Sequence, residues 1–252
     1  MKRLFILATG LVLLLLTGCY SFNEKISAAD ITLDQLEDSM QSAMDPNGRF
    51  AKAQTYVMRQ EITTDRSWME LPIVQMVEIK FRAPDQFKLT TYTDNEPEHI
   101  IIANGSNGYF VDMNRKKVIQ LEQKKLAGVL MMSRLTNPGI RLKNVFKSIS
   151  IDRSRIGEED FYRLTCTGEN TNPIYIYVSC RDFFSKRLRM TMGSVGNRIN
   201  YDSRMLNYSM YEGIMIPDES IVRQGSVEQK SKVVYYKLDI ALDDKEFQPP
   251  LF

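Results

Sequence analysis

Apolar and polar residues alternate with a period of two over much of the chain beyond residue 50. The clearest runs cover residues 77–81, 188–192 and 236–242, where valine, isoleucine, leucine, methionine or aromatic residues occupy every second position. Side chains at alternate positions of a strand share one face, so each run predicts a strand with one buried face. We expect an antiparallel sheet that curves into a barrel or half-barrel.

Residues typical of turns separate these runs, as expected for many short strands. Glycine and asparagine tolerate the left-handed backbone of tight turns, and proline fixes the conformation of others. The predicted turns lie at Asn104-Gly105, Asn107-Gly108, Gly157, Gly196-Asn197 and Pro217-Asp218.

Two stretches have helical spacing instead. Thr32 with Gln35 forms a capping-box pattern, and Pro46-Asn47-Gly48 ends the segment; its apolar face comprises Leu33, Leu36, Met40 and Met44. A second helix is predicted over residues 124–135, before Asn137-Pro138-Gly139. It is either a plug or lid over the concave face of the sheet or an ordinary helix covering one side.

The first nineteen residues follow the pattern of an export signal. Lys2 and Arg3 precede an apolar run over residues 4–16, which is too short for a comfortable membrane span. The run ends in Leu-Thr-Gly-Cys19, which resembles the bacterial lipobox; the resemblance implies that Cys19 is lipidated and becomes the mature N-terminus. The alternative is an ordinary signal cut nearby. We expect a lipoprotein signal peptide over residues 1–18, lipidated Cys19 and a tether over residues 19–30, and a domain over residues 31–252.

Composition narrows the range of partners. The chain of 252 residues has 33 basic and 31 acidic residues, and without the two basic residues of the predicted signal peptide the charges balance. A nucleic-acid partner would favour a basic surface, so none is expected. Membrane attachment would come from lipid on Cys19, because no polybasic segment or further long apolar run is present.

Two cysteines remain, and they fall on consecutive predicted strands. Cys166 lies near the connecting loop and Cys180 near the far end of the next strand. In a tight hairpin this register holds their Cα atoms more than about 7 Å apart, too far for a disulfide. We expect two separate buried thiols; a larger loop would permit a disulfide.

Catalytic and metal-binding patterns are weak. His99 is the single histidine, and Ile100–Ile102 follow it on a predicted strand, which favours a structural or solvated role over that of a catalytic base. Asp243, Asp244 and Glu246 lack the pattern of a calcium-binding loop and suit a solvated turn. We predict no catalytic residue, metal site or cofactor, and no enzymatic activity.

A series of short motifs resembles one family of envelope proteins. Phe81-Arg-Ala-Pro-Asp-Gln-Phe-Lys-Leu89 is followed by a strand from His99, a glycine-containing hairpin and Tyr109-Phe-Val-Asp112. Further along come Gly213-Ile-Met-Ile-Pro217 and Phe247-Gln-Pro-Pro250. Their order resembles the LolA/LolB-like periplasmic lipoprotein carriers and outer-membrane lipoprotein receptors. The fold implied is mainly β (α+β): a strongly curved antiparallel half-barrel around a few short helices.

The resemblance also implies an apolar cavity that takes acyl chains of lipoproteins or phospholipids. Thirteen methionines outside the predicted signal peptide are compatible with such a cavity, because methionine adapts to irregular ligands; they are equally compatible with an ordinary core. The expected ligand-binding residues are Phe81, Leu89, Met131 and Met132 inside, with Lys88 or Arg82 at the mouth. Lys88 matches the family pattern better than Arg82 does.

The sequence therefore leads to two functional hypotheses. The first is a lipid-anchored envelope protein that binds acyl chains, as in the transfer of lipoproteins to the outer membrane, with a periplasmic carrier protein as a further partner. Tyr20 after Cys19 favours the outer membrane, since an aspartate there retains lipoproteins in the inner membrane of enteric bacteria. The second is an envelope sensor or interaction lipoprotein that contacts a protein partner and transports no lipid.

Overall fold

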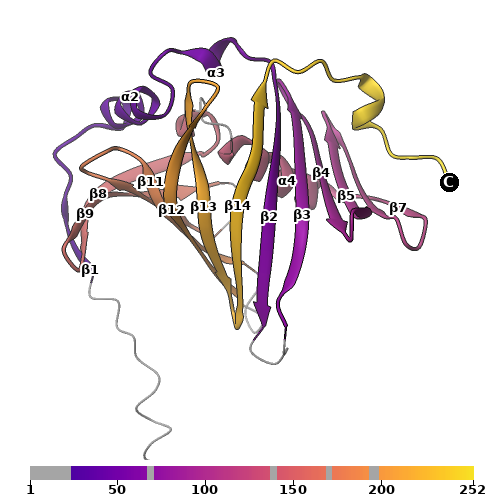
Figure 1. Cartoon of the computed structure of the whole chain (residues 1–252). Coiled ribbons are helices and arrows are strands. Elements are labelled where there is room, and N and C mark those ends of the chain that lie inside the picture. The colour runs from indigo at the N-terminus through magenta and orange to yellow at the C-terminus, as the bar shows by residue number, and fades with distance from the viewer. Residues whose placement is uncertain (1–23, 67–70, 137–140, 169–171, 193–198) are drawn as a thin grey trace, which may run out of the picture.

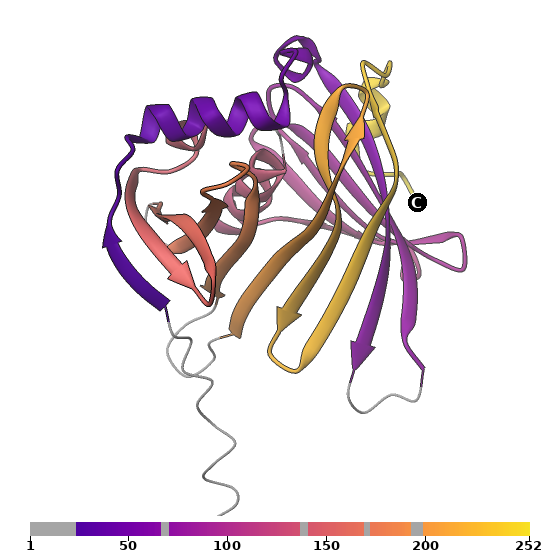
Figure 2. The ribbon, with the colours of Figure 1, turned by 60° about the vertical axis from the view of Figure 1, so that its left-hand side comes forward.

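One antiparallel sheet of fourteen strands organises the part of the chain that the computed structural model describes, residues 24–66, 71–136, 141–168, 172–192 and 199–252 (Figure 1). The strand order is β1-β8-β9-β10-β11-β12-β13-β14-β2-β3-β4-β5-β6-β7, so the sheet remains open, with β1 and β7 at its edges. Its strong curvature makes a half-barrel, as predicted (Figure 2).

The strands follow one another mostly through hairpins. Their bounds are β1 Glu24–Ala28, β2 Thr55–Arg66, β3 Ile73–Arg82, β4 Gln86–Thr93, β5 Glu96–Asn104, β6 Asn107–Asp112, β7 Lys117–Gln120, β8 Ser148–Ile156, β9 Glu159–Thr167, β10 Ile174–Ser179, β11 Ser185–Met192, β12 Ile199–Tyr211, β13 Ile214–Gln224 and β14 Val227–Leu238.

Short helices accompany the sheet. They are α2 Leu33–Met44, α3 Arg49–Lys52, α4 Gln123–Leu135 and the 3-10 turns η1 Leu142–Asn144 and η2 Asp244–Phe247. Figure 2 shows α2 lying across one end of the curved sheet. Among the described residues, no helix combines the length and apolar character needed to cross a membrane.

Both predicted helices are present, and the capping box at the first is confirmed. The Thr32 hydroxyl accepts the backbone N–H of Gln35 at 3.3 Å, while the Gln35 side chain accepts the backbone N–H of Thr32 at 3.0 Å. This pairing satisfies two donors that a helix N-terminus otherwise leaves open. The helix ends at Met44, and the Asp45 carboxylate then accepts the N–H groups of Arg49 and Phe50, which starts α3.

Two apolar clusters fill the concave side of the sheet. The first joins the central strands to α3 and α4, with members Phe50, Ala53, Tyr56, Met58, Val77, Ile79, Phe81, Phe87, Ala103, Leu126, Ile214, Ile216, Val233, Tyr236 and Leu238. The second joins the strands of the β8–β11 half to α2 and η1, with members Leu36, Leu142, Phe146, Tyr162, Leu164, Cys166, Ile174, Ile176, Val178 and Leu188. At ~25 cal/mol per Å² of buried apolar area, these clusters dominate the stability of the fold.

The predicted second helix, α4, lies on the concave side against β6. Leu126 is 3% exposed, and its Cδ1 atom lies 2.7 Å from the position that a Cβ would take on Gly108. The Asn107-Gly108 turn prediction was therefore wrong: both residues belong to β6, and Gly108 provides space for the helix instead of a turn. The real turn is Gly105-Ser106, beside the predicted Asn104-Gly105.

The other turn and strand predictions had mixed outcomes. The turn at Gly157 is confirmed. Pro217-Asp218 lies inside β13, where Asp218 has no partner residue on β12; this bulge accommodates the proline. The third alternating run ends at Leu238, because Asp239 adopts a left-handed backbone with φ of 54°. Gly196-Asn197, Asn137-Pro138-Gly139 and the whole segment over residues 1–23, including Cys19, lie outside the described residues.

The two cysteines are separate thiols, as predicted. Cys166 is fully buried on β9 and Cys180 is half-buried just after β10, whereas both were expected to be buried. Burial raises the pKa of the Cys166 thiol to about 12, so this group stays protonated at neutral pH.

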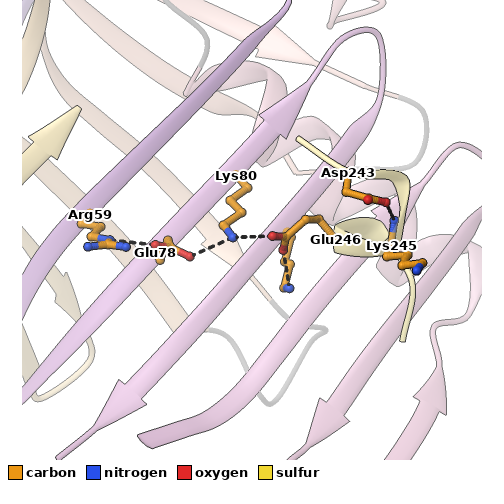
Figure 3. A network of polar contacts seen from close by, with 7 residues as sticks. Arg59, Glu78, Lys80, Asp243, Lys245 and Glu246 are labelled. Atoms are coloured by element: carbon orange, nitrogen blue, oxygen red, sulfur yellow. Dashed lines mark hydrogen bonds and ion pairs between the residues drawn. The ribbon is translucent and has the colours of Figure 1, made fainter. Parts of the chain in front are cut away.

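A third cluster lies on the convex side, under the C-terminal segment. Phe247 of η2 is fully buried against Ile100, Ile102 and Val111 of β5 and β6. Figure 3 shows the network of charged side chains to which Glu246, the neighbour of Phe247, belongs. The Glu246 carboxylate accepts hydrogen bonds from Nζ of Lys80 and from Nζ of Lys88, each with an N–O distance of 3.0 Å.

The same network continues across the convex face. Lys80 Nζ lies 3.5 Å from Glu78, which is 6% exposed and also accepts Arg59 Nε at 2.7 Å. Arg82 pairs with Asp244 and packs its guanidinium 5.1 Å from the centre of the Phe247 ring. Buried charges are tolerated only when paired, so the C-terminal segment and these strands depend on each other.

We predict that Gly108→Ala destabilises the fold, because the added methyl group collides with buried Leu126. The free energy of unfolding in urea should fall by about 1–3 kcal/mol. Gly128→Ala on the same α4 is the control: a Cβ there meets no atom within 4 Å, and alanine favours the helix by about 0.5–1 kcal/mol. Equal effects of the two substitutions would contradict the close approach of α4 to β6.

The second prediction concerns pH and Glu246. Burial raises the pKa of this carboxyl, but hydrogen bonds from Lys80 and Lys88 outweigh it and leave the pKa below its ordinary value of 4.5. A lowered pKa in the folded state adds stability above about pH 4.5, and this stability is lost as the pH falls through the folded-state pKa. Glu246→Gln should therefore cost about 1 kcal/mol at pH 7, allowing for solvent screening, and this cost should shrink as the pH falls from about 4.5 through the folded-state pKa.

The measurement is the urea midpoint of both proteins at several pH values. Glu158→Gln, at the exposed tip of the β8–β9 hairpin, is the control and should leave the free energy of unfolding unchanged at every pH measured. A stability difference between Glu246→Gln and the unsubstituted protein that does not shrink as the pH falls below about 4.5 would contradict the network.

Candidate functional site

An apolar pocket lies at the seam between the two concave clusters. Its volume is about 200 Å³. Four methionines contribute to it, and α2, the end of α4, η1 and six strands form its wall. The lining residues are Glu37, Met40, Gln41, Met44, Met58, Gln60, Leu135, Thr136, Arg141, Leu142, Ile176, Ser185, Leu188, Met205, Tyr208, Ile216, Pro217 and Tyr236.

Helix α2 supplies one wall through residues spaced along one face. Glu37, Met40, Gln41 and Met44 follow the i, i+3, i+4, i+7 spacing of a helix face, so all four reach the pocket. Leu36, fully buried in the second cluster, fixes the helix beside them. Two ion pairs hold α2 to the segment around η1: Asp34 with Lys143 at 2.6 Å and Asp38 with Arg141 at 2.5 Å.

The strands supply the opposite wall by simple alternation. Met58 and Tyr236 are direct partners on β2 and β14, and Ile176 and Leu188 are direct partners on β10 and β11. Partners in an antiparallel pair share a face, so each pair projects to the concave side together. The first pair belongs to one cluster and the second to the other, which places the pocket at their junction.

Two polar atoms in the residues of this wall lack hydrogen bonds. The Tyr236 hydroxyl and Glu37 Oε2 are shielded from solvent and have no hydrogen-bond partner. Glu37 Oε2 lies 3.7 Å from the Arg141 guanidinium, while its other oxygen accepts the N–H of Lys143 at 3.1 Å. Burial raises the pKa of the Tyr236 hydroxyl, so this group is neutral and able to donate.

None of the four residues that were predicted to lie inside the cavity lines this pocket. Phe81 is 4% exposed and stacks on Tyr56 with ring centres 5.2 Å apart, and Leu89 packs against the same first cluster. Met131 packs against the second cluster, and Met132 on α4 is half-buried. Their predicted contact with a ligand stays a prediction.

Lys88 and Arg82 lie on the other face of the sheet. Lys88 is adjacent to Leu89, and Arg82 is adjacent to Phe81, in the strand sequence. Because successive side chains of a strand point to opposite faces and Leu89 and Phe81 point inward, Lys88 and Arg82 project to the convex side. There Lys88 pairs with Glu246 and Arg82 with Asp244. This position disagrees with the expected place at the mouth of the cavity, because both cations hold the C-terminal segment.

The pocket residues that the sequence analysis missed carried detectable signals. Met40 and Met44 were assigned to an apolar helix face, and Leu188 and Tyr236 opened alternating runs. The sequence indicated that these residues face inward. It gave no sign that Leu188 and Tyr236 line one pocket, because they are 48 positions apart in the chain.

A second depression is larger but has a different character. It measures about 840 Å³ and is an open groove bordered by Phe161 and Tyr177, which alternate with inward residues of β9 and β10. Its rim carries acidic residues such as Glu158 and basic residues such as Arg181 and Arg204. Mixed charges around an open surface favour neither an apolar nor an ionic ligand.

The described residues provide few candidate metal ligands. Within them no group of three or more histidine, cysteine or acidic side chains could hold an ion. His99 Nδ1 lies 3.8 Å from Glu98, and the imidazole packs against the Phe110 ring with centres 5.4 Å apart.

Comparisons of the sequence alone found no relative: no family model and no curated protein matches it. Solved structures do match. A LolA superfamily protein from Nitrosomonas europaea has a TM-score of 0.61 at 16% identity, over 87% of this chain and 98% of that one. A DUF1329 family protein from Desulfovibrio piger reaches 0.56 at 11% identity, over 86% and 97%.

A third similar structure is an outer membrane lipoprotein-sorting protein domain from Vibrio parahaemolyticus. Its TM-score is 0.56 at 9% identity, over 86% of this chain and 97% of that one. At such identities the likeness concerns the backbone, and it extends over nearly the full length of each of the three similar chains. The protein therefore has the LolA-like fold.

Proposed function

We propose that this protein binds acyl chains of lipoproteins or lipids in the pocket at the seam between its two concave clusters. The observation that carries the proposal is the pocket itself, an apolar space lined by four methionines inside a LolA-like fold. Methionine side chains are flexible and polarisable, so they can adapt to a chain of variable length or shape. The proposal is one of binding and release, without catalysis.

The size of the pocket sets the strength of binding. Its volume of about 200 Å³ is below the ~300–1,000 Å³ of typical small-molecule sites, so it takes part of one acyl chain. Each methylene removed from water contributes ~0.8 kcal/mol, and five of them contribute ~4 kcal/mol. Binding of this strength holds a chain and still permits its release, as a transfer protein requires.

The location that we propose is the bacterial envelope, with lipid on Cys19 after removal of residues 1–18. The lipobox-like sequence supports this anchor, and Tyr20 supports the outer membrane. Because β1 begins at Glu24, at most about 18 Å of extended chain separates Cys19 from the sheet. The anchor would then hold the β1 edge close to the membrane surface.

A role in lipoprotein sorting fits both the fold and this location. One of the similar structures is an outer membrane lipoprotein-sorting protein domain, which supports an acyl ligand carried on a lipoprotein and a periplasmic carrier as partner. The alternative is an envelope sensor that contacts a protein partner. It would have a pocket that stays empty, and a lipid assay separates the two.

We predict that residues 21–252, exported to the periplasm and purified without Cys19, retain about one lipid or acylated peptide per protein. This fragment contains every described strand and all three clusters. Native mass spectrometry with lipid extraction gives the stoichiometry. An empty protein that also fails to take up a fluorescent fatty acid would sink the proposal and favour the sensor, to be pursued by crosslinking.

Two methionines of β12 provide a matched test of the pocket. Met205 lines it, whereas Met210 is 57% exposed. Met205→Trp should fill space equal to at least two methylenes, which lowers occupancy about tenfold, while Met210→Trp leaves binding unchanged. Thermal melts confirm that both variants fold. Equal binding by the two variants would place the ligand elsewhere.

A further inference from the structure

The sheet ends at β7, and one side of this strand is open (Figure 1). Among the described residues β7 pairs with β6 alone, and every residue from Lys117 to Gln120 is exposed. The two central residues are apolar, with Val118 38% and Ile119 42% exposed. An edge strand presents backbone donors and acceptors to any further strand, and exposed apolar side chains add surface that such a strand can bury.

The register between β6 and β7 shows which backbone groups face the open side. The N–H of Leu121 donates to the carbonyl of Gly108 at 2.8 Å, so these two residues form a hydrogen-bonded pair. Bonded and non-bonded pairs alternate in an antiparallel ladder, which makes Ile119 the next residue of β7 to bond β6. The N–H and C=O groups of Val118 and Gln120 therefore point away from β6, at the two-residue spacing that an added strand requires.

The two faces of the sheet differ in character beside this edge. On the convex face, Val118 lies beside its partner Val111, which is fully buried in the third cluster. On the concave face, Lys117 accompanies Ile119, and α4 adds the exposed pair Lys124-Lys125 at its start. An added strand would thus meet apolar surface on one face and positive charge on the other.

The positive charge is only partly neutralised within the chain. Residues 112–125 contain five basic residues and two acidic ones. Arg115 lies 3.7 Å from Asp112, and Lys125 lies 3.6 Å from Glu122. The other three basic residues, Lys116, Lys117 and Lys124, have no ion pair among the described residues. Two β7 edges would repel each other, whereas an acidic strand would be attracted.

We propose that the open edge of β7 binds an extended segment of a partner protein in which apolar and acidic residues alternate. The backbone of this segment would pair with Val118 and Gln120. Its apolar side chains would lie beside Val118 and extend the third cluster, and its acidic side chains would lie beside Lys117. The surface is separate from the pocket, so the inference goes beyond the proposed function and does not depend on acyl binding.

The test uses the full-length protein in uncharged detergent micelles and a short fluorescent peptide of alternating glutamate and valine. The control peptide has lysine in place of glutamate. Fluorescence anisotropy should show at least about tenfold tighter binding of the acidic peptide, and salt should reduce this difference. Hydrogen exchange at the amides of Val118 and Gln120 should slow when the acidic peptide is bound, because these N–H groups become paired.

Substitutions at one position separate backbone pairing from side-chain contact. Val118→Pro removes an N–H that points outward and leaves the bonds of β7 to β6 in place, so thermal melts should show a folded protein. It should weaken binding of the acidic peptide about tenfold, while Val118→Ile, which keeps the N–H, leaves binding unchanged. Lys117→Glu should weaken it about fivefold, and Lys25→Glu on the opposite edge strand β1 should have no effect.

Three results would overturn the inference. Equal binding of the acidic and basic peptides would exclude selection by charge, and equal binding by Val118→Pro and Val118→Ile would exclude pairing with the edge. Vesicles of phosphatidylglycerol that bind in a manner sensitive to Lys117→Glu, in the absence of any peptide binding, would assign the basic residues to a membrane surface. Self-association that Val118→Pro abolishes would make a second copy of the chain the occupant.

Discussion

The concave face of one open sheet has to be buried, and the rest of the structure follows from that requirement. Fourteen strands present far more apolar surface than a single helix can cover, so the curvature brings the two halves toward each other and short helices fill the remaining space. Leu126 of α4 belongs to the first cluster and Leu36 of α2 to the second, and Met131 and Leu135 of α4 also pack against the second cluster. The pocket lies where the two clusters meet and neither helix fills the gap.

The convex face of the sheet is partly covered as well. Such a face is commonly solvated in an antiparallel sheet, but here β3 to β6 are covered by the C-terminal segment. Phe247 supplies the apolar contact, and Glu246 neutralises two lysines that would otherwise repel each other. Lys88 and Arg82, which the family resemblance assigns to ligand binding, thus stabilise the C-terminal segment. The pocket is lined mainly by apolar side chains.

Most buried polar side-chain atoms of the described residues have hydrogen-bond partners, and the four that lack one belong to Glu37, Arg163, Asp218 and Tyr236. Thr32 and Gln35 satisfy each other, and Tyr56 has Thr136, whereas Tyr236 and one oxygen of Glu37 have no hydrogen-bond partner. Two of these four residues, Glu37 and Tyr236, line the pocket with its four methionines, and Glu37 Oε2 lies 3.7 Å from the Arg141 guanidinium.

The sequence by itself determined the local structure, because period and capping depend on neighbours in the chain. The alternation along β3 placed Phe81 inside, and the capping box fixed the start of α2. Gly108 shows the limit: in the sequence a glycine indicates a turn, but here it is a strand residue whose missing side chain leaves space for Leu126. The pocket joins Met40, Leu188 and Tyr236 from distant segments, and the curvature that brings them together is a property of the whole sheet. Which inward residues meet, and which of their polar atoms stay unpaired, was decided by the tertiary structure alone.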